Sequence, residues 1–366
     1  MRFIAITLIT LIIFTFSFPI IGHADPSVSA NNAVLIEQST GRILYEKNAH
    51  EKSNIASITK IMTAIIAIES GKMEELATAS KKAVYTEGSS IYLKQGEKMK
   101  LEDLVYGLML RSGNDAAVTI AEHVAGSEEG FVYLMNEKAE WLGMTNTHFD
   151  NPHGLDSETH YSSAYDMALL MRYAMQNEKF QQITGAKFFK SESREYSWKN
   201  KNKLLTAYYK YCTGGKTGFT KQTGRTLVST ATKDGMNLIA VTLDAPSDWR
   251  DHMQMYDWGF TQYDMEPLGG EGFIDIELGS KEKIRGYIQE ETLYPLKPEE
   301  KKTIRSETSA FKENLPWSSE HIVGKKTYYL GDEPITEIAI YQEGQPEEPS
   351  FFENSISVFK QIFRMG

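Results

Sequence analysis

The spacing of apolar and polar residues changes along the first part of the chain. Residues 33–37 and 42–46 are β-like runs on either side of a turn-like Gln-Ser-Thr-Gly, which predicts a β-hairpin. Residues 57–69 are then apolar on nearly all sides, and Gly71 follows them as a typical helix end. Such a helix lies in a core or a membrane, and this one is shorter than the roughly 20 residues that cross a bilayer. We therefore expect a helix buried in a core.

More helices and a second group of strands are predicted further along. Helical spacing covers residues 101–111, 116–124, 130–142, 163–176 and 249–263. Short β-like runs cover residues 216–219, 225–232 and 236–243, and an Asp-Gly turn signal joins the last two. Strands at the start, a helical middle and strands at the end predict an α+β fold, in which both ends complete one antiparallel sheet with helices on both faces.

The rest of the chain indicates a second domain and a tail. Residues 266–345 contain short alternating runs without long helices, which predicts a small β-rich domain. In residues 346–366, four large apolar side chains recur at helical spacing: Phe352, Ile356, Phe359 and Phe363. This pattern favours an amphipathic helix that lies on a membrane surface, and docking of the helix on the protein itself is the alternative.

Residues 1–24 have the organisation of a signal peptide. A basic start precedes an almost entirely apolar run over residues 3–21, and Gly22-His23-Ala24 places small residues where signal peptidase cuts. Cleavage after Ala24 leaves residues 25–265 as the main domain, and an uncleaved anchor is the alternative. In both cases the rest of the chain is expected outside the cytoplasm.

Composition and isolated reactive residues narrow the function. The net charge of −10 argues against nucleic acid as a partner. The single cysteine, Cys212, allows no internal disulfide and is expected to be a small buried residue rather than a reactive thiol. No His-Glu-x-x-His or comparable cluster is present, so no metal is expected. His153 and Asp166 look chemical in isolation, but we expect them to fasten loops.

The first candidate for chemistry is the run from Ser57 to Lys60. On a helix, Ser-x-x-Lys places a hydroxyl and an amine on one face, where a neutral lysine can accept the serine proton. The spacing alone is a weak signal, because the chain contains it four times, starting at Ser57, Ser280, Ser309 and Ser357. The copy at Ser57 opens the long buried helix, whose N-terminal amides could also stabilise an oxyanion.

Two further motifs follow in order. Ser112-Gly113-Asn114 falls between two predicted helices, and Lys216-Thr217-Gly218 falls in a predicted strand. The ordered set Ser-x-x-Lys, Ser-Asp-Asn and Lys-Thr-Gly is typical of β-lactamases and penicillin-binding proteins, with Gly113 as the departure here. A phosphate-binding loop at residues 214–217 is excluded, because Lys210 stands where that motif needs a glycine.

Residues 57–72, 86–124, 151–168 and 214–219 resemble the low-molecular-mass D-alanyl-D-alanine carboxypeptidases, most closely the sporulation-specific type of endospore-forming bacteria. The resemblance implies a β-lactamase/transpeptidase-like catalytic domain over residues 25–265, without a cofactor. It also implies a serine acyl-enzyme that removes the terminal D-alanine from peptidoglycan stem peptides ending in D-Ala-D-Ala. Such an enzyme would limit cross-linking in the spore cortex, and β-lactam antibiotics would inhibit it covalently.

The resemblance also implies catalytic roles. Ser57 attacks the carbonyl between the two D-alanines, with Lys60 as its base. Ser112 passes a proton to the leaving D-alanine, and Asn114 holds the peptide amide. Lys216 lies near Lys60 and Ser112 and helps to keep Lys60 unprotonated through repulsion between like charges.

The remaining implied roles concern binding. The backbone amides of Ser57 and Phe219 form the oxyanion hole. Thr217 contacts the terminal carboxylate, and Gly218 lets the substrate backbone pass closely. Arg250, just beyond the last predicted strand, is a second candidate for the carboxylate, and an ordinary surface arginine is the alternative.

Other interpretations differ in activity. A β-lactamase shares the acylation chemistry, but the common class uses a Glu-x-x-x-Asn tetrad that does not occur between Ser112 and Lys216. A catalytically silent wall-binding protein would ordinarily lack one of Ser57, Lys60 or Lys216. Endopeptidase action on cross-links stays open at this point.

Overall fold

The computed structural model describes residues 25–278, 282–311 and 322–342. The expected signal peptide, residues 1–24, and the expected amphipathic tail, residues 346–366, lie outside these ranges. Within the three ranges, no helix is both long enough and apolar enough to cross a bilayer.

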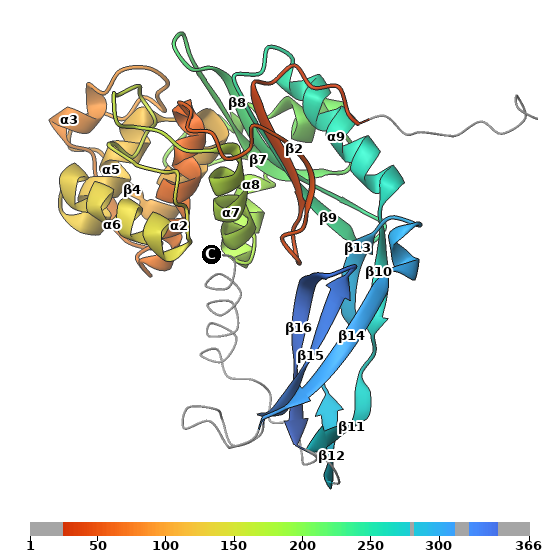
Figure 1. The fold of residues 1–366 in the computed structure, drawn as a ribbon. Helices are drawn as coiled ribbons and strands as arrows, with labels where there is room; N and C mark the ends of the chain where they lie inside the picture. Colours follow the sequence, from red (N-terminus) through yellow and green to blue (C-terminus); the bar gives the residue numbers. More distant parts are fainter. Residues whose placement is uncertain (1–24, 279–281, 312–321, 343–366) are drawn as a thin grey trace, which may run out of the picture.

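A five-stranded antiparallel sheet forms the centre of the first domain, in the order β2–β1–β9–β8–β7 (Figure 1). Its strands come from both ends of the domain: β1 (Asn32–Glu37), β2 (Ile43–Lys47), β7 (Cys212–Thr220), β8 (Gly224–Lys233) and β9 (Met236–Leu243). β1 pairs with β9 from Asn32 opposite Leu243 to Glu37 opposite Leu238. The predicted α+β class is therefore confirmed. Strand β7, which carries the Lys-Thr-Gly motif, is an edge strand of this sheet.

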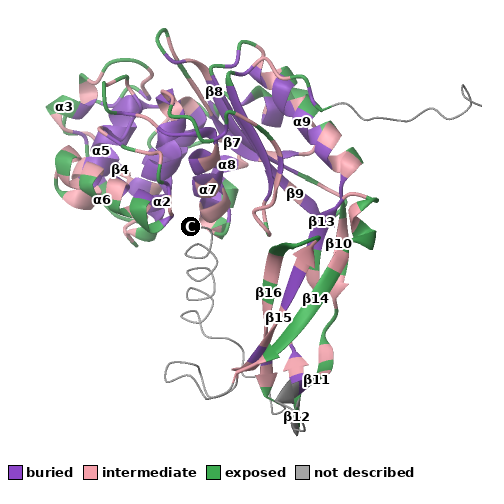
Figure 2. Ribbon diagram, viewed as in Figure 1, coloured by how far each residue is buried: buried purple, intermediate pink, exposed green. Residues whose placement is uncertain are grey.

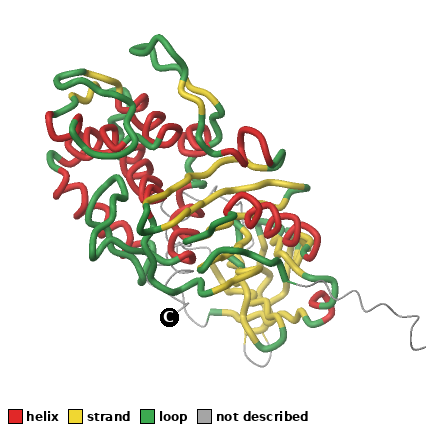
Figure 3. Tube along the Cα trace, turned by 90° about the horizontal axis from the view of Figure 1, so that it is seen from above, coloured by secondary structure: helices red, strands yellow, loops and turns green. Residues whose placement is uncertain are grey.

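Helices cover both faces of the sheet (Figures 1 and 3). On one face, Met255 and Tyr256 of α9 (Asp248–Gln262) share a core with Leu35 and Leu238. On the other face, α7 packs on β1 and β9, and the buried helix α2 packs on α7. The helices of this second layer are α2 (Lys60–Glu69), α3 (Lys81–Val84), α4 (Leu101–Tyr106), α5 (Asn114–Ala125), α6 (Glu128–Trp141), α7 (Ala164–Ala174) and α8 (Glu178–Thr184). Figure 2 shows strands β8 and β9 of the sheet coloured mostly as buried between the two layers.

Several short elements were not predicted from the sequence. The expected helix over residues 101–111 is an α-helix as far as Tyr106 and then a π-helical turn, η2 (Gly107–Arg111). A second π-helical turn and four short strands connect the larger elements: η3 (Leu204–Tyr208), β3 (Leu76–Thr78), β4 (Lys98–Lys100), β5 (Phe188–Phe189) and β6 (Trp198–Lys199). The apolar spacing of a short segment does not distinguish a π-helical turn from an α-helical one, since both repeat about once in four residues.

The second domain is built from strands, as predicted. β10 (Asp264–Gly269) pairs with β13 (Thr292–Leu296). A five-stranded sheet has the order β11 (Gly272–Leu278), β12 (Glu282–Ile288), β16 (Glu333–Gln342), β15 (Ile322–Leu330) and β14 (Ile304–Ala310), and the short helix η4 (Glu300–Lys302) precedes β14. Ile276, Ile288 and Ile340 form a small buried cluster in this sheet.

Arg42, at the turn between β1 and β2, joins the two domains. Its guanidinium binds both carboxylate oxygens of Glu300, at 2.6 and 3.0 Å, and donates to the carbonyl of Pro295. It also lies over the rings of Tyr263 and Tyr294, at 5.1 and 5.3 Å. Because the Arg42 and Glu300 side chains are only 13% and 20% exposed, this pair is better protected from solvent than an exposed ion pair such as that of Lys100 and Glu74.

Replacing Arg42 by alanine should therefore destabilise the protein. The variant leaves the Glu300 carboxylate partly buried without its partner, and we expect the free energy of unfolding to fall by about 2 kcal/mol. Urea unfolding followed by tryptophan fluorescence measures the change. Lys100→Ala is the control, since Lys100 pairs with Glu74 at 3.3 Å on an exposed surface and should leave stability nearly unchanged. An equal fall in the free energy of unfolding in the two variants would contradict the assignment of Arg42 as the residue that joins the two domains.

Candidate active site

Ser57 and Lys60 face each other where the chain enters α2. Ser57 lies in a 3₁₀ turn, η1 (Ala56–Thr59), and the α-helix begins at Lys60 rather than at Ser57 as predicted. Ala56 holds a left-handed backbone conformation, φ 49°, which turns the chain just before the serine. Lys60 Nζ lies 2.9 Å from Ser57 Oγ. The partly exposed hydroxyl is thus within reach of an amine that is completely buried.

The other hydrogen-bond partners of Lys60 are oxygens without charge. Its Nζ donates to Asn114 Oδ1, at 2.7 Å, and to the main-chain carbonyl of His153. Asn114 is the first residue of α5, and its Nδ2 donates to the main-chain carbonyl of Glu87. The side chain of Asn114 is therefore fixed at both ends, and one of its functions in this structure is to hold Lys60.

Ser112 and Lys216 meet beside this pair. Ser112 follows the π-helical turn η2 in a left-handed conformation, φ 64°, which directs it away from the helix. Lys216 on β7 is only 1% exposed, and its Nζ lies 3.0 Å from Ser112 Oγ. The same Nζ donates to the carbonyl of Thr217, at 2.6 Å. The fold thus brings together the three sequence motifs, which are far apart along the chain.

The two buried lysines have lowered pKa values. Burial is the largest reason that the pKa of Lys60 lies well below its usual value, and the charges of Lys216 and Lys201 lower it further. Asp115 acts in the opposite direction and more weakly. Burial, followed by the charge of Lys201, lowers the pKa of Lys216 to about 7. This arrangement favours a neutral amine at Lys60 next to Ser57.

A pocket of about 320 Å³ opens above Ser57 between the helical layer and β7. Of the predicted site residues, Ser57, Ser112, Thr217, Gly218 and Phe219 line it, and they are joined by Ser89, Lys201, Arg225, Asp248 and Trp249. Gly218 is required by close approach, because a Cβ at this position would lie 2.9 Å from the backbone nitrogen of Ser57. The edge strand β7 therefore runs directly past the serine, where an extended peptide can pair with it.

Arg250 is not among the residues that line this pocket. It is exposed and lines a neighbouring hollow of about 460 Å³. Two cations that line the pocket, Lys201 and Arg225, were not predicted from the sequence. Arg225 binds the buried carboxylate of Asp248, with its shortest contact at 2.7 Å. No local pattern could have indicated this pair, because Arg225 lies on β8 and Asp248 at the start of α9.

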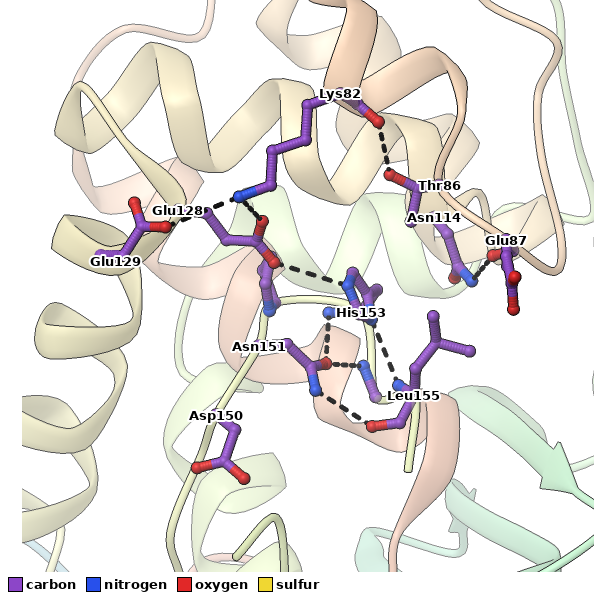
Figure 4. A network of polar contacts seen from close by, with 12 residues as sticks. Lys82, Thr86, Glu87, Asn114, Glu128, Glu129, Asp150, Asn151, His153 and Leu155 are labelled. Atoms are coloured by element: carbon purple, nitrogen blue, oxygen red, sulfur yellow. Dashed lines mark hydrogen bonds and ion pairs between the residues drawn. The ribbon is translucent and has the colours of Figure 1, made fainter. Parts of the chain in front are cut away.

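Figure 4 shows the loop that supplies the His153 carbonyl to Lys60. Asn151 Oδ1 accepts hydrogen bonds from the N–H groups of His153, at 3.3 Å, and Gly154, at 2.7 Å. The N–H of Leu155 donates to His153 Nδ1 at 3.2 Å, and His153 Nε2 lies 3.5 Å from Glu128 Oε1. These contacts agree with the predicted loop-fastening role of His153.

Asp166 and Cys212 also have structural surroundings, as predicted. Asp166 Oδ2 accepts hydrogen bonds from the N–H of Asn146 and from Thr147 Oγ1, both at 2.7 Å, and so fastens the loop before β-bridge residue His148. Cys212 is 8% exposed, and burial raises the pKa of its thiol to about 12. The thiol therefore stays protonated at neutral pH.

Comparison with known proteins points to one family. The family model described as D-alanyl-D-alanine carboxypeptidase, peptidase family S11, matches residues 21–247. D-alanyl-D-alanine carboxypeptidase DacF of Bacillus subtilis is 39% identical over 249 residues, which cover 65% of this chain and 64% of the relative. D-alanyl-D-alanine carboxypeptidase DacA of Escherichia coli is 28% identical over 367 residues, which cover 92% of this chain and 89% of the relative.

A solved structure gives the same result. Penicillin-binding protein 5 of Haemophilus influenzae superposes with a TM-score of 0.74 and 27% identity, covering 89% of this chain and 100% of the neighbour. The chain spans 64% and 62% of the length of the first two curated relatives, DacF and Escherichia coli DacC. Because the family model covers more than half of the chain and its three motifs meet in one pocket, the chain belongs to the D-alanyl-D-alanine carboxypeptidase family of peptidases, S11.

Proposed function

We propose that this protein is a serine-type D-Ala-D-Ala carboxypeptidase, which removes the terminal D-alanine from peptidoglycan stem peptides through an acyl-enzyme. One observation carries the proposal: a completely buried lysine, with a lowered pKa, lies 2.9 Å from the hydroxyl of a partly exposed serine. A neutral amine at this distance can take the proton of Ser57 Oγ as the oxygen attacks a carbonyl. Family membership supplies the substrate class.

In the acylation step, Ser57 Oγ forms a bond to the carbonyl carbon between the two D-alanines, and Lys60 accepts the proton. The backbone N–H groups of Ser57 and Phe219 would stabilise the oxyanion, a role supported by the close approach of β7 to Ser57. The C–N bond then breaks, and the proton held by Lys60 reaches the departing amine through the hydroxyl of Ser112, which is hydrogen-bonded to Lys216, so that Lys60 is neutral again. Water hydrolyses the ester and restores Ser57.

The terminal carboxylate of the substrate needs a hydroxyl or a cation in the pocket. Thr217 supplies a hydroxyl there, and Lys201 stands at the same pocket with its Nζ 3.1 Å from Ser89 Oγ. The charge of Arg225 is already balanced by Asp248. We therefore assign the carboxylate to Thr217 and Lys201, and the role of Arg250 stays a prediction of the family resemblance.

A β-lactamase is the second candidate, since its acylation step is the same. A rapid β-lactamase needs a group that activates water for hydrolysis of the ester. Among the described residues that line the pocket, Asp248 is the single carboxylate, and it is held by Arg225. This arrangement favours a long-lived penicillin ester and a carboxypeptidase over a β-lactamase. A silent wall-binding role is disfavoured because Ser57, Lys60 and Lys216 are all in place.

The proposed location follows from the ends of the chain. A cleaved signal peptide would export the enzyme to the outer face of the cytoplasmic membrane, where peptidoglycan is available. The expected amphipathic tail would keep it there. A role in the spore cortex stays a prediction of the resemblance, and the match to a Bacillus subtilis relative is in keeping with it.

The function is tested by release of D-alanine from a pentapeptide that ends in D-Ala-D-Ala. The protein should release one D-alanine per peptide, and penicillin should block the reaction by forming one ester per chain at Ser57. Intact-mass analysis detects the adduct. In Ser57→Ala both the release and the adduct should disappear, and an adduct that survives in this variant would rule out Ser57 as the nucleophile.

The rate of acylation should rise with pH, because only the neutral Lys60 amine accepts the Ser57 proton. The rising limb should lie well below pH 10.5, in line with the lowered pKa of Lys60. Lys216→Met removes a like charge without admitting water, so it should move this limb to higher pH. Stopped-flow acylation by a fluorescent penicillin measures the profile.

Lys60→Ala should lower the rate of acylation about 10²- to 10⁴-fold and abolish the rise of the rate with pH. If the acylation rate of Lys216→Met rises at the same pH as that of the unaltered protein, the proposed effect of the Lys216 charge on Lys60 is wrong.

Removal of residues 349–366 from the mature chain should separate membrane binding from catalysis. Burial of each large apolar side chain in the membrane surface contributes about 1.5 to 3 kcal/mol before ordering costs. Lys360 and Arg364 would add attraction to anionic lipid. Co-sedimentation with anionic vesicles should show binding by the full mature chain alone, with equal peptide turnover in both forms. Equal binding by the two forms, or loss of turnover in the shorter one, would show that the tail packs on the protein.

A further inference from the structure

A network of polar side chains extends from the loop that carries His153 (Figure 4). It starts at the His153 carbonyl, which accepts a hydrogen bond from Lys60, and continues through the His153 ring to Glu128 at the start of α6. From there it reaches Lys82 on α3, whose Nζ lies 2.7 Å from Glu128 Oε2. None of these three outer residues belongs to the sequence motifs of the site.

The partners of Lys60 determine which way its lone pair points. A neutral amine has two N–H donors and one lone pair. Asn114 Oδ1 and the His153 carbonyl can take the two N–H groups, and the lone pair then faces Ser57 Oγ, 2.9 Å away. If the His153 carbonyl moves, one N–H is released and can turn toward Ser57, which misdirects the base. The position of this carbonyl therefore matters for proton transfer.

The hydrogen bonds of the loop fix the tautomer of His153. The N–H of Leu155 donates to Nδ1, so Nδ1 carries no proton and the neutral ring has its proton on Nε2. That proton faces Glu128 Oε1, 3.5 Å away. The ring is 90% buried from solvent, and burial lowers its pKa, which agrees with a neutral imidazole. Glu128 is thus the acceptor that holds the ring, and through the ring it holds the loop.

Glu128 is itself well placed for this function. It is the first residue of α6, and Ser127 caps that helix by accepting a hydrogen bond from the N–H of Gly130. The hydrogen bond with His153 and the contact with Lys82 hold the pKa of Glu128 at about 2, so it is a carboxylate at neutral pH. The neighbouring Glu129 also approaches Lys82, at 3.6 Å, but it is exposed and points away from His153 (Figure 4).

Because the His153 loop packs closely against the turn that carries Ser57, the position of the loop also affects the position of the serine. Gly154, directly after His153, has φ +81°, and a Cβ at this position would lie 2.0 Å from the carbonyl oxygen of Ala56. The loop therefore packs against the turn that carries Ser57 while it also binds Lys60. A shift of the loop would therefore change the geometry between the Lys60 amine and the Ser57 hydroxyl.

We propose that Glu128 is a positioning residue, which holds the His153 ring and thereby keeps the His153 carbonyl where it directs the Lys60 amine at Ser57. The proposal rests on the proposed function, in which Ser57 is acylated with Lys60 as base. It assigns to Glu128 an effect on the acylation rate although the side chain contacts neither the substrate nor the reacting atoms.

The test compares two variants of similar size in the mature protein. Glu128→Gln keeps an oxygen that accepts the His153 proton, whereas Glu128→Met removes the acceptor. We expect the first-order acylation constant with a fluorescent penicillin to fall about 10- to 100-fold in Glu128→Met and to stay within about threefold of the unaltered protein in Glu128→Gln. The dissociation constant of the non-covalent penicillin complex should be unchanged in both, because the pocket lining is intact.

Glu129→Met is the matched control, since it removes a carboxylate that also approaches Lys82 but leaves His153 untouched. The unfolding temperature of each variant is measured first, so that acylation rates are compared at a temperature far below it. If Glu128→Met does not fold, His153→Ala replaces it, since that variant removes the ring and keeps the carbonyl. The role of Glu128 is overturned if Glu128→Met and Glu128→Gln are acylated at equal rates, or if Glu129→Met slows acylation as much as Glu128→Met does. In either case, acylation of the unaltered protein still supports the proposed function. Absence of acylation in the unaltered protein overturns both.

Discussion

The structure depends on the burial of Lys60 next to Ser57. A charged ammonium in a dry core is strongly disfavoured unless an anion balances it. The hydrogen-bond partners of Lys60 are instead a hydroxyl, an amide oxygen and a main-chain carbonyl, and its surroundings include two further lysines. Loss of the proton relieves this conflict, and the lowered pKa of Lys60 favours the neutral amine that the proposed serine nucleophile needs as its base. We infer that the unfavourable burial of this ionisable group is the origin of the proposed reactivity.

The fold supplies this burial by closing one sheet with strands from both ends of the domain. The pairing of β1 with β9 places the start of α2 beside β7, so that residues from three distant parts of the chain meet at the sheet edge. Gly218 lets β7 approach the serine closely, because a Cβ at this position would lie 2.9 Å from the backbone nitrogen of Ser57, and Gly154 brings the His153 loop against the same turn. The surrounding helices exclude water from Lys60 and leave Ser57 open to the pocket. Packing and reactivity are therefore not separable in this domain.

Much of this could be predicted from the sequence, and the reasons are physical. Apolar periodicity predicts the hairpin, the buried helix α2 and strands β7 to β9. The three motifs identify Ser57, Ser112 and Lys216, because each motif is a short run of residues that can be recognised from the local sequence alone. The start of α2 at Lys60 and the π-helical turn before Ser112 were missed, since they depend on backbone angles at Ala56 and Ser112 that non-glycine residues rarely adopt. Lys201, Arg225 and Glu128 were missed because each acts through a partner far away in sequence. Arg250, expected at the site, lines the neighbouring hollow instead.

The protonation state of Lys60 can be measured directly. The mature protein, labelled with ¹³C at the lysine Cε positions, can be titrated by NMR, and Lys60 can be assigned from the signal that disappears in Lys60→Ala. We expect the Lys60 signal to change with a midpoint far below the usual lysine value of 10.5. A Lys60 signal that keeps the chemical shift of an ammonium up to pH 10 would show that Lys60 stays charged and is not the base for Ser57.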